Sequence, residues 1–249
     1  MASMYQVAKP EFKMNILVYG IPGVGKTVFA ASAQDCPHMK DVLVLNIEGG
    51  LLSVADRGDI TAVDIRSMEE LEEQFWNLAN RKEGYERFQT VVIDSGSELQ
   101  TLNLEQIARQ SLNKPESKRQ GKTMDDLWIE DYGKSTANLR RIFRWFRDLP
   151  LHVIITALPK TIYSGTRGQG EPTAVVPSLT DKLGESLMGY VDAVWYMYMD
   201  SEENRKILTQ SKGIHRAKTR GIAFSKSLGL VLEDPDMNKI HELFLEGGK

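Results

Sequence analysis

Eight consecutive residues near the start of the chain have the composition of a phosphate-binding loop. The pattern G-x-x-x-x-G-K-[ST] is matched by Gly20, Ile21, Pro22, Gly23, Val24, Gly25, Lys26 and Thr27. Its glycines let backbone N–H groups turn inward around phosphate oxygens, so we assign the whole loop to nucleotide binding. We expect Lys26 to reach the β- and γ-phosphates of a nucleoside triphosphate and the Thr27 hydroxyl to bind Mg²⁺. The alternative is a glycine-rich turn that binds nothing.

Two carboxylates follow apolar stretches downstream of this loop. Asp94 ends the run Val91-Val92-Ile93, which is the Walker B pattern, and we expect it to hold Mg²⁺ beside Thr27. Glu48 follows another apolar run, at a strand end where open α/β sheets bind their ligands. A carboxylate there can polarise the water that attacks the γ-phosphate. For Glu48 the alternative is a loop residue that faces solvent and merely lies near the site.

A dense basic run lies late in the chain, from His215 to Gly221. It is either a solvated edge strand or a finger that acts on a neighbouring subunit. In the second interpretation Lys218 and Arg220 reach the γ-phosphate held by that neighbour and stabilise the charge that develops during phosphoryl transfer. The pattern alone leaves both interpretations open.

The hydrophobic pattern predicts the elements that position these residues. Short apolar runs predict strands at 15–19, 41–46, 61–65, 88–93, 151–157 and 191–199, and helices are expected at 27–34, 67–79, 97–112, 126–148 and 178–190. Buried strands that alternate with helices indicate an α/β fold. We expect a mostly parallel twisted sheet with helices on both faces and antiparallel strands added at one edge. Residues 15–249 would form one domain behind an N-terminal arm, 1–14.

Composition narrows the class of protein. The chain has 249 residues, with 31 Lys and Arg against 34 Asp and Glu, so its net charge of −3 gives no global signal for nucleic acid. Cys36 is the single cysteine, which excludes a disulfide within the chain. There is no membrane-length apolar run and no signal-peptide pattern, so we expect a cytoplasmic protein.

Taken together, the motifs resemble the RecA-like ATPase family. Residues 20–27 match its Walker A motif and Asp94 its Walker B motif, while 45–49 resemble the strand end that carries the catalytic glutamate of RecA-type recombinases. Residues 217–221 resemble the Lys-x-Arg finger of the DnaB-helicase and KaiC branches. The resemblance implies a RecA-like P-loop core, with ATP and Mg²⁺ as cofactors and ATP hydrolysis as the activity.

Within that family the sequence is most similar to the short phage-encoded annealing recombinases of the Sak type, also called phage nucleotide-binding proteins. This resemblance implies single-stranded DNA binding, strand annealing in recombination, a single-stranded-DNA-binding protein as partner, and a homo-oligomer (ring or filament) in a bacterial host. One departure is at Thr156-Ala157, where RecA proteins carry Asn-Gln. Thr156 is then the remaining candidate for sensing the γ-phosphate.

Two polar stretches, 113–124 and 160–177, are expected to be mobile loops. By the same resemblance they correspond to the two DNA-binding loops. Their candidate DNA contacts are Lys114, Lys118, Arg119, Lys122, Lys160, Tyr163 and Arg167, with Tyr163 as a platform on which a base stacks. Two alternatives stay open: a RecA-fold ATPase that acts on protein as a switch or assembly factor, and a helicase or motor core.

Overall fold

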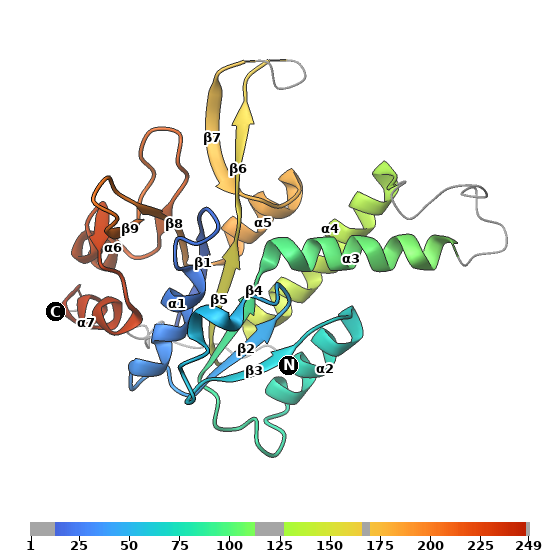
Figure 1. The fold of residues 1–249 in the computed structure, drawn as a ribbon, viewed down its shortest axis with the longest axis horizontal. Helices are drawn as coiled ribbons and strands as arrows, with labels where there is room; N and C mark the ends of the chain where they lie inside the picture. Colours follow the sequence, from blue (N-terminus) through green and yellow to red (C-terminus); the bar gives the residue numbers. More distant parts are fainter. Residues whose placement is uncertain (1–12, 113–126, 166–169, 248–249) are drawn as a thin grey trace, which may run out of the picture.

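The computed structural model describes residues 13–112, 127–165 and 170–247. Residues 1–12 of the predicted N-terminal arm and the whole of the first predicted loop, 113–124, lie outside the described residues. Figure 1 shows a central sheet flanked by helices, from which a two-stranded hairpin projects.

A nine-stranded sheet forms the centre of the molecule, in the order β11-β9-β8-β1-β5-β4-β2-β3, with β10 paired to β8. Its parallel strands are β1 (Asn15–Tyr19), β2 (Val42–Asn46), β3 (Thr61–Asp64), β4 (Thr90–Asp94), β5 (His152–Ala157) and β8 (Ala193–Met199). Its antiparallel strands are β9 (Arg205–Leu208), β10 (Lys218–Thr219) and β11 (Val231–Glu233). The predicted parallel sheet with antiparallel strands at one edge is therefore confirmed.

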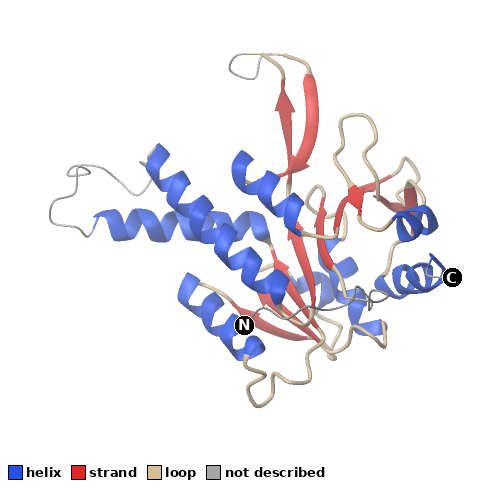
Figure 2. Ribbon diagram, turned by 180° about the vertical axis from the view of Figure 1, so that it is seen from behind, coloured by secondary structure: helices blue, strands red, loops and turns tan. Residues whose placement is uncertain are grey.

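Helices cover both faces of this sheet (Figure 2). One face carries α2 (Met68–Ala79), α3 (Gly96–Leu112), α4 (Ile129–Asp148) and α5 (Asp181–Tyr190), and the other carries α1 (Lys26–Ala31), α6 (Ile222–Leu228) and α7 (Met237–Gly247). Side chains of β1 alternate between the two cores: Leu17 and Tyr19 join the first, Ile16 and Val18 the second. All of β1 is buried, so the loop that follows it starts from the rigid middle of the domain. Among the described residues, no helix combines the length and apolarity needed to cross a membrane.

The stretch 160–177, predicted as a mobile loop, is largely a β-hairpin. Strands β6 (Pro159–Tyr163) and β7 (Pro172–Pro177) pair antiparallel, with Lys160 opposite Val176 and Ile162 opposite Ala174. The Gly, Thr and Pro content suggested a loop, but proline is tolerated at the start and edge of a strand, which is where these prolines lie. A second difference is α6, a helix that the sequence pattern did not separate from the strand after it.

Histidine burial predicts how stability depends on pH. His152 at the start of β5 is buried, and its Nδ1 accepts the backbone N–H of Met14 at 3.2 Å. Burial lowers the pKa of His152 to about 4, against about 6.5 in an unfolded chain. A group whose pKa is lowered on folding contributes its full stability above the unfolded pKa and loses it as pH falls toward the folded pKa. The free energy of unfolding should therefore drop by about 2 kcal/mol from pH 7.5 to pH 5 through this residue.

Urea denaturation at the two pH values measures this drop. In His152→Asn the side-chain oxygen can still accept the Met14 N–H but takes up no proton, so the pH dependence should flatten. Burial also lowers the pKa of His241, so part of the dependence should remain. An unchanged drop in the variant would assign the proton uptake to other groups.

Candidate nucleotide site

The glycine-rich loop joins β1 to α1 and is held close to its neighbouring strands. The N–H of Gly20 donates to the carbonyl of Ala157 at 3.2 Å. A Cβ on Gly20 would lie 2.3 Å from the Met197 carbonyl oxygen, so no larger residue fits there. Gly23 and Gly25 have φ of +78° and +101°, a region that favours glycine. The motif glycines are thus required by the geometry of this turn.

The side chain of Lys26 folds back over the start of the phosphate-binding loop. Its Nζ donates to the carbonyl oxygens of Gly20 at 2.9 Å and Ile21 at 3.0 Å, and the side chain is buried. Burial lowers the pKa of Lys26, and the carboxylates of Glu48 and Asp94 act in the opposite direction. The predicted catalytic lysine and both predicted acids therefore share one electrostatic environment.

Asp94 at the end of β4 connects two other predicted site residues. Its Oδ2 accepts the hydroxyl of Thr27 at 2.8 Å, and its Oδ1 accepts the hydroxyl of Thr156. Strand β5 lies between β1 and β4, which brings Thr156 to the same strand ends. A hydroxyl and a carboxylate are hard oxygen donors, and Mg²⁺ in nucleotide sites is held by few protein ligands together with phosphates. Thr27 and Asp94 fit this donor set.

Glu48 is exposed on a turn that hydrogen bonds to Asp94 and Asn46 hold in place. The backbone N–H groups of Ile47 and Glu48 donate to the Asp94 carbonyl at 2.7 and 3.0 Å. Asn46 accepts the N–H of Gly49 at 3.0 Å and donates to Asp64 at 2.7 Å. The carboxylate of Glu48 is therefore presented to solvent beside Lys26 and Asp94. Asn46 was not singled out from the sequence, although an asparagine ending a buried strand is a usable signal.

The predicted finger residues, Lys218 and Arg220, lie away from the phosphate-binding loop of their own chain, residues 20–27. Lys218 pairs with Val194, near the start of β8, whereas the loop follows the far end of β1. Arg220 donates to Asp192 at 3.1 Å and to the Gly189 carbonyl at 2.5 Å. Burial, then the charge of Arg220, lowers the pKa of Lys218. Any contact of these cations with a γ-phosphate would have to be made between subunits.

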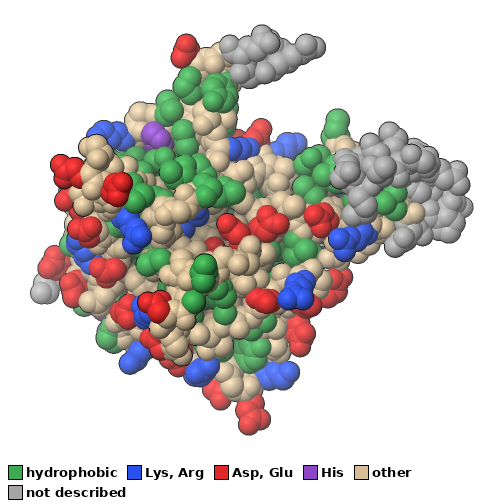
Figure 3. All heavy atoms as spheres, viewed as in Figure 1, with side chains coloured by type: hydrophobic (Ala, Val, Ile, Leu, Met, Phe, Trp, Pro, Cys, Tyr) green, Lys and Arg blue, Asp and Glu red, His purple; other side chains and the backbone are tan. Residues whose placement is uncertain are grey.

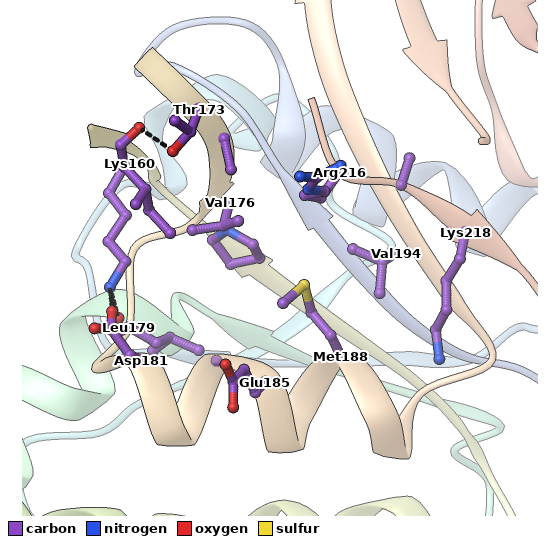
Figure 4. A pocket seen from close by; sticks show the side chains of 15 residues that line it. Lys160, Thr173, Val176, Leu179, Asp181, Glu185, Met188, Val194, Arg216 and Lys218 are labelled. Carbon is purple, nitrogen blue, oxygen red and sulfur yellow. Dashed lines mark hydrogen bonds and ion pairs between the residues drawn. The ribbon is translucent and has the colours of Figure 1, made fainter. Parts of the chain in front are cut away.

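A separate cavity of about 560 Å³ lies between the hairpin, α5 and residues 216–218 (Figure 4). Val176, Met188 and Val194 make its wall apolar, and Lys160 and Lys218 both line it. Lys160 is held by Asp181 at 2.6 Å and by the Leu179 carbonyl at 2.5 Å. Lys160, a predicted DNA contact, and Lys218, a predicted finger residue, therefore line the same cavity.

The remaining predicted DNA contacts are only partly described. Tyr163 is exposed at the outer end of β6. Lys114, Lys118, Arg119, Lys122 and Arg167 lie outside the described residues.

Tyr19 links the loop to the hairpin. It is the last residue of β1 and is fully buried, and its hydroxyl lies 2.9 Å from the Val175 carbonyl oxygen and 2.6 Å from that of Arg216. Because a hydroxyl has one proton to donate, the two carbonyls share it. The residue that precedes Gly20 is therefore tied to β7 and to the segment leading to Lys218.

The mostly parallel α/β sheet and the glycine-rich loop after β1 together form a P-loop core, as predicted. Residues 13–221 match the family described as AAA domain, and the chain belongs to that family. A solved structure that it resembles is described as "Crystal structure of the RadB recombinase", with 16% identity, a TM-score of 0.40, and coverage of 82% of this chain and 81% of that chain. No curated protein matches the chain.

Proposed function

We propose that the protein binds ATP with Mg²⁺ and hydrolyses it. The observation that carries this proposal is the contact between Thr27 and Asp94 beside the buried Lys26. In this proposal Lys26 binds the β- and γ-phosphates, Thr27 and Asp94 hold Mg²⁺, and Thr156 contacts the γ-phosphate. Glu48 orients and deprotonates the attacking water. Mg²⁺ supplies charge neutralisation on the phosphate oxygens when it is bound.

We further propose that hydrolysis serves single-stranded DNA binding and strand annealing in recombination, in a phage-encoded protein that works with a single-stranded-DNA-binding protein. The hairpin supports this proposal because it continues from β5, the strand that carries Thr156 next to Asp94. Tyr163 is 48% exposed on the hairpin, where a base can stack on it. The cations of 113–124 and Arg167 would contact the phosphate backbone.

The same proposal makes the protein a homo-oligomer, in which Lys218 and Arg220 act on the nucleotide of a neighbouring subunit. Support comes from their position beside the start of β8, whereas the phosphate-binding loop of the same chain follows the opposite end of β1. Asp192 and Gly189 orient the Arg220 side chain, whose exposure of 52% keeps it accessible.

ATP hydrolysis with and without single-stranded DNA, over a salt series, tests the DNA proposal. Stimulation that fades as salt rises is expected, because phosphate contacts release counterions. Tyr163→Ala should weaken DNA binding by about 5- to 100-fold, the range for one lost stacking contact, while Tyr163→Phe keeps the ring and the affinity. Equal hydrolysis rates and no DNA retention at low salt would contradict the DNA proposal and leave the ATPase proposal intact.

One observation favours the second candidate, a switch that acts on protein. Lys160 is the single cation on the described part of the hairpin, and it is already paired with Asp181. Figure 3 shows apolar side chains along the hairpin, where Ile162 is 39% exposed. Such a surface suits a protein partner as well as a base. For the third candidate, a helicase or motor core, duplex unwinding in place of annealing would be the distinguishing activity.

A further inference from the structure

Arg205, which the sequence analysis did not single out, lies directly against the nucleotide loop. It opens β9, opposite Met199 of β8. A Cβ built on Gly25 would lie 2.9 Å from its Nε and 3.2 Å from both Cδ and Cζ. Gly25 immediately precedes Lys26, so a second cationic side chain packs on the residue next to the catalytic lysine.

The backbone that carries Arg205 is held firmly. Asp200 accepts the N–H groups of Glu202 and Asn204, both at 2.9 Å, which closes the turn between β8 and β9. Lys206 bridges Asp200 at 3.0 Å and Glu233 at 2.8 Å, and this bridge lowers the pKa of Asp200 to about 2. The carbonyl of Arg205 accepts the N–H of Asp234 at 3.0 Å. The side chain therefore starts from a fixed position.

The Arg205 guanidinium has no carboxylate partner among the described residues. Its neighbour Lys206 has two acidic partners, but no ion pair joins Arg205 to an acid in the part of the chain that the structure describes. The side chain is exposed. An unpaired guanidinium beside a phosphate-binding loop has the geometry and charge to bind phosphate oxygens in a bidentate way.

The sheet order assigns Arg205 to one side of the site. Strands β8 and β9 lie on one side of β1, and β5, β4 and β2 lie on the other. Thr156 is on β5, Asp94 ends β4, and Glu48 follows β2. In the proposed mechanism the γ-phosphate faces Thr156 and Glu48. Arg205 is then on the side of the loop away from the γ-phosphate, so the phosphates within its reach would be the α- and β-phosphates.

We propose that Arg205 binds the α- and β-phosphates of the nucleotide held by its own chain. This inference rests on the proposed nucleotide binding by residues 20–27 and adds a binding residue to that site. Its role differs from that of Lys218 and Arg220, which would act between subunits. Because ADP and ATP share these two phosphates, Arg205 contributes to the affinity for both.

Calorimetric titration with Mg·ATP and Mg·ADP tests the inference on the full chain. Arg205→Ala should weaken the binding of both nucleotides by about 10- to 100-fold, as expected for a lost charge-assisted hydrogen bond. Arg205→Lys should recover part of the affinity, since it restores the charge but not the bidentate contact. Turnover at saturating ATP should change less than the affinity does. The matched control is Arg66→Ala, an exposed arginine beyond the far edge strand β3, which should bind like the wild type.

Several outcomes separate this inference from the proposed function. Wild-type affinity in Arg205→Ala, with binding lost in Lys26→Ala, would overturn the role of Arg205 and keep the nucleotide site. Weakened ATP binding with unchanged ADP binding would also overturn it, because the contact would then be with the γ-phosphate. No nucleotide binding by the wild type would refute the proposed function itself, and the Arg205 inference with it.

Discussion

Lys26→Ala should reduce ATP affinity by at least about 100-fold and leave no measurable hydrolysis. The Lys26 ammonium donates hydrogen bonds to the carbonyl oxygens of Gly20 and Ile21 in the phosphate-binding loop. Its side chain is buried and supplies the positive charge of the site. Alanine removes both the charge and its hydrogen bonds to phosphate, and no other described lysine reaches the same place. Equilibrium titration with ATP and a phosphate-release assay measure the two losses.

The control for this change is Lys40→Ala, an exposed lysine beyond the helical segment that follows the loop. It should bind and hydrolyse ATP like the wild type. Circular dichroism and a thermal melt establish that Lys26→Ala is folded. A folded Lys26→Ala variant with wild-type affinity would mean that the loop does not bind phosphates, and the proposed function would fail at its first step.

Glu48→Gln should lower the rate of ATP hydrolysis by about 100- to 10,000-fold while ATP affinity changes little. Glutamine has nearly the same shape but cannot take a proton from water. The turn should keep its position, because backbone N–H groups of Ile47 and Glu48 and the side chain of Asn46 hold it, and none of these contacts uses the Glu48 carboxylate. Single-turnover hydrolysis beside equilibrium binding separates the two effects.

A matched control is Glu83→Gln, at an exposed glutamate after α2, which should bind and hydrolyse ATP like the wild type. If Glu48→Gln hydrolysed ATP at the wild-type rate, Glu48 would be a solvent-facing residue near the site, the alternative that the sequence left open. The catalytic base would then have to be sought among other groups, and the roles of Lys26 and Asp94 would be unaffected.

The parts of the site that the sequence predicted are those that depend on local order along the chain. The loop is continuous in sequence, and its glycines are explained by one turn between β1 and α1. Asp94 and Glu48 were predicted as site residues because Asp94 ends a buried strand and Glu48 closely follows one, and strand ends of a parallel sheet meet at one edge. The alternation of buried strands and helices likewise gave the fold class.

Features that depend on the order of strands in space were not predictable in this way. The contact between Thr156 and Asp94 requires β5 to lie between β1 and β4, which no local pattern reveals. Arg205 reaches Gly25 because the antiparallel β9 folds back beside β8, far from the loop in sequence. The hairpin at 159–177 was missed because its prolines and glycines carry the composition of a loop while its pairing is between residues of the same segment.

The position of β1 in the sheet has a consequence for the order in which the protein folds during synthesis. This strand is made before the other described strands of the sheet, yet its partners are β5 at 153–157 and β8 at 193–196. Until residue 196 has left the ribosome, one edge of a strand that is fully buried in the folded protein has nothing to pair with, and such edges favour aggregation. The nucleotide loop, although encoded near the start, can take its final shape only after Met197, whose carbonyl lies against Gly20, has been added.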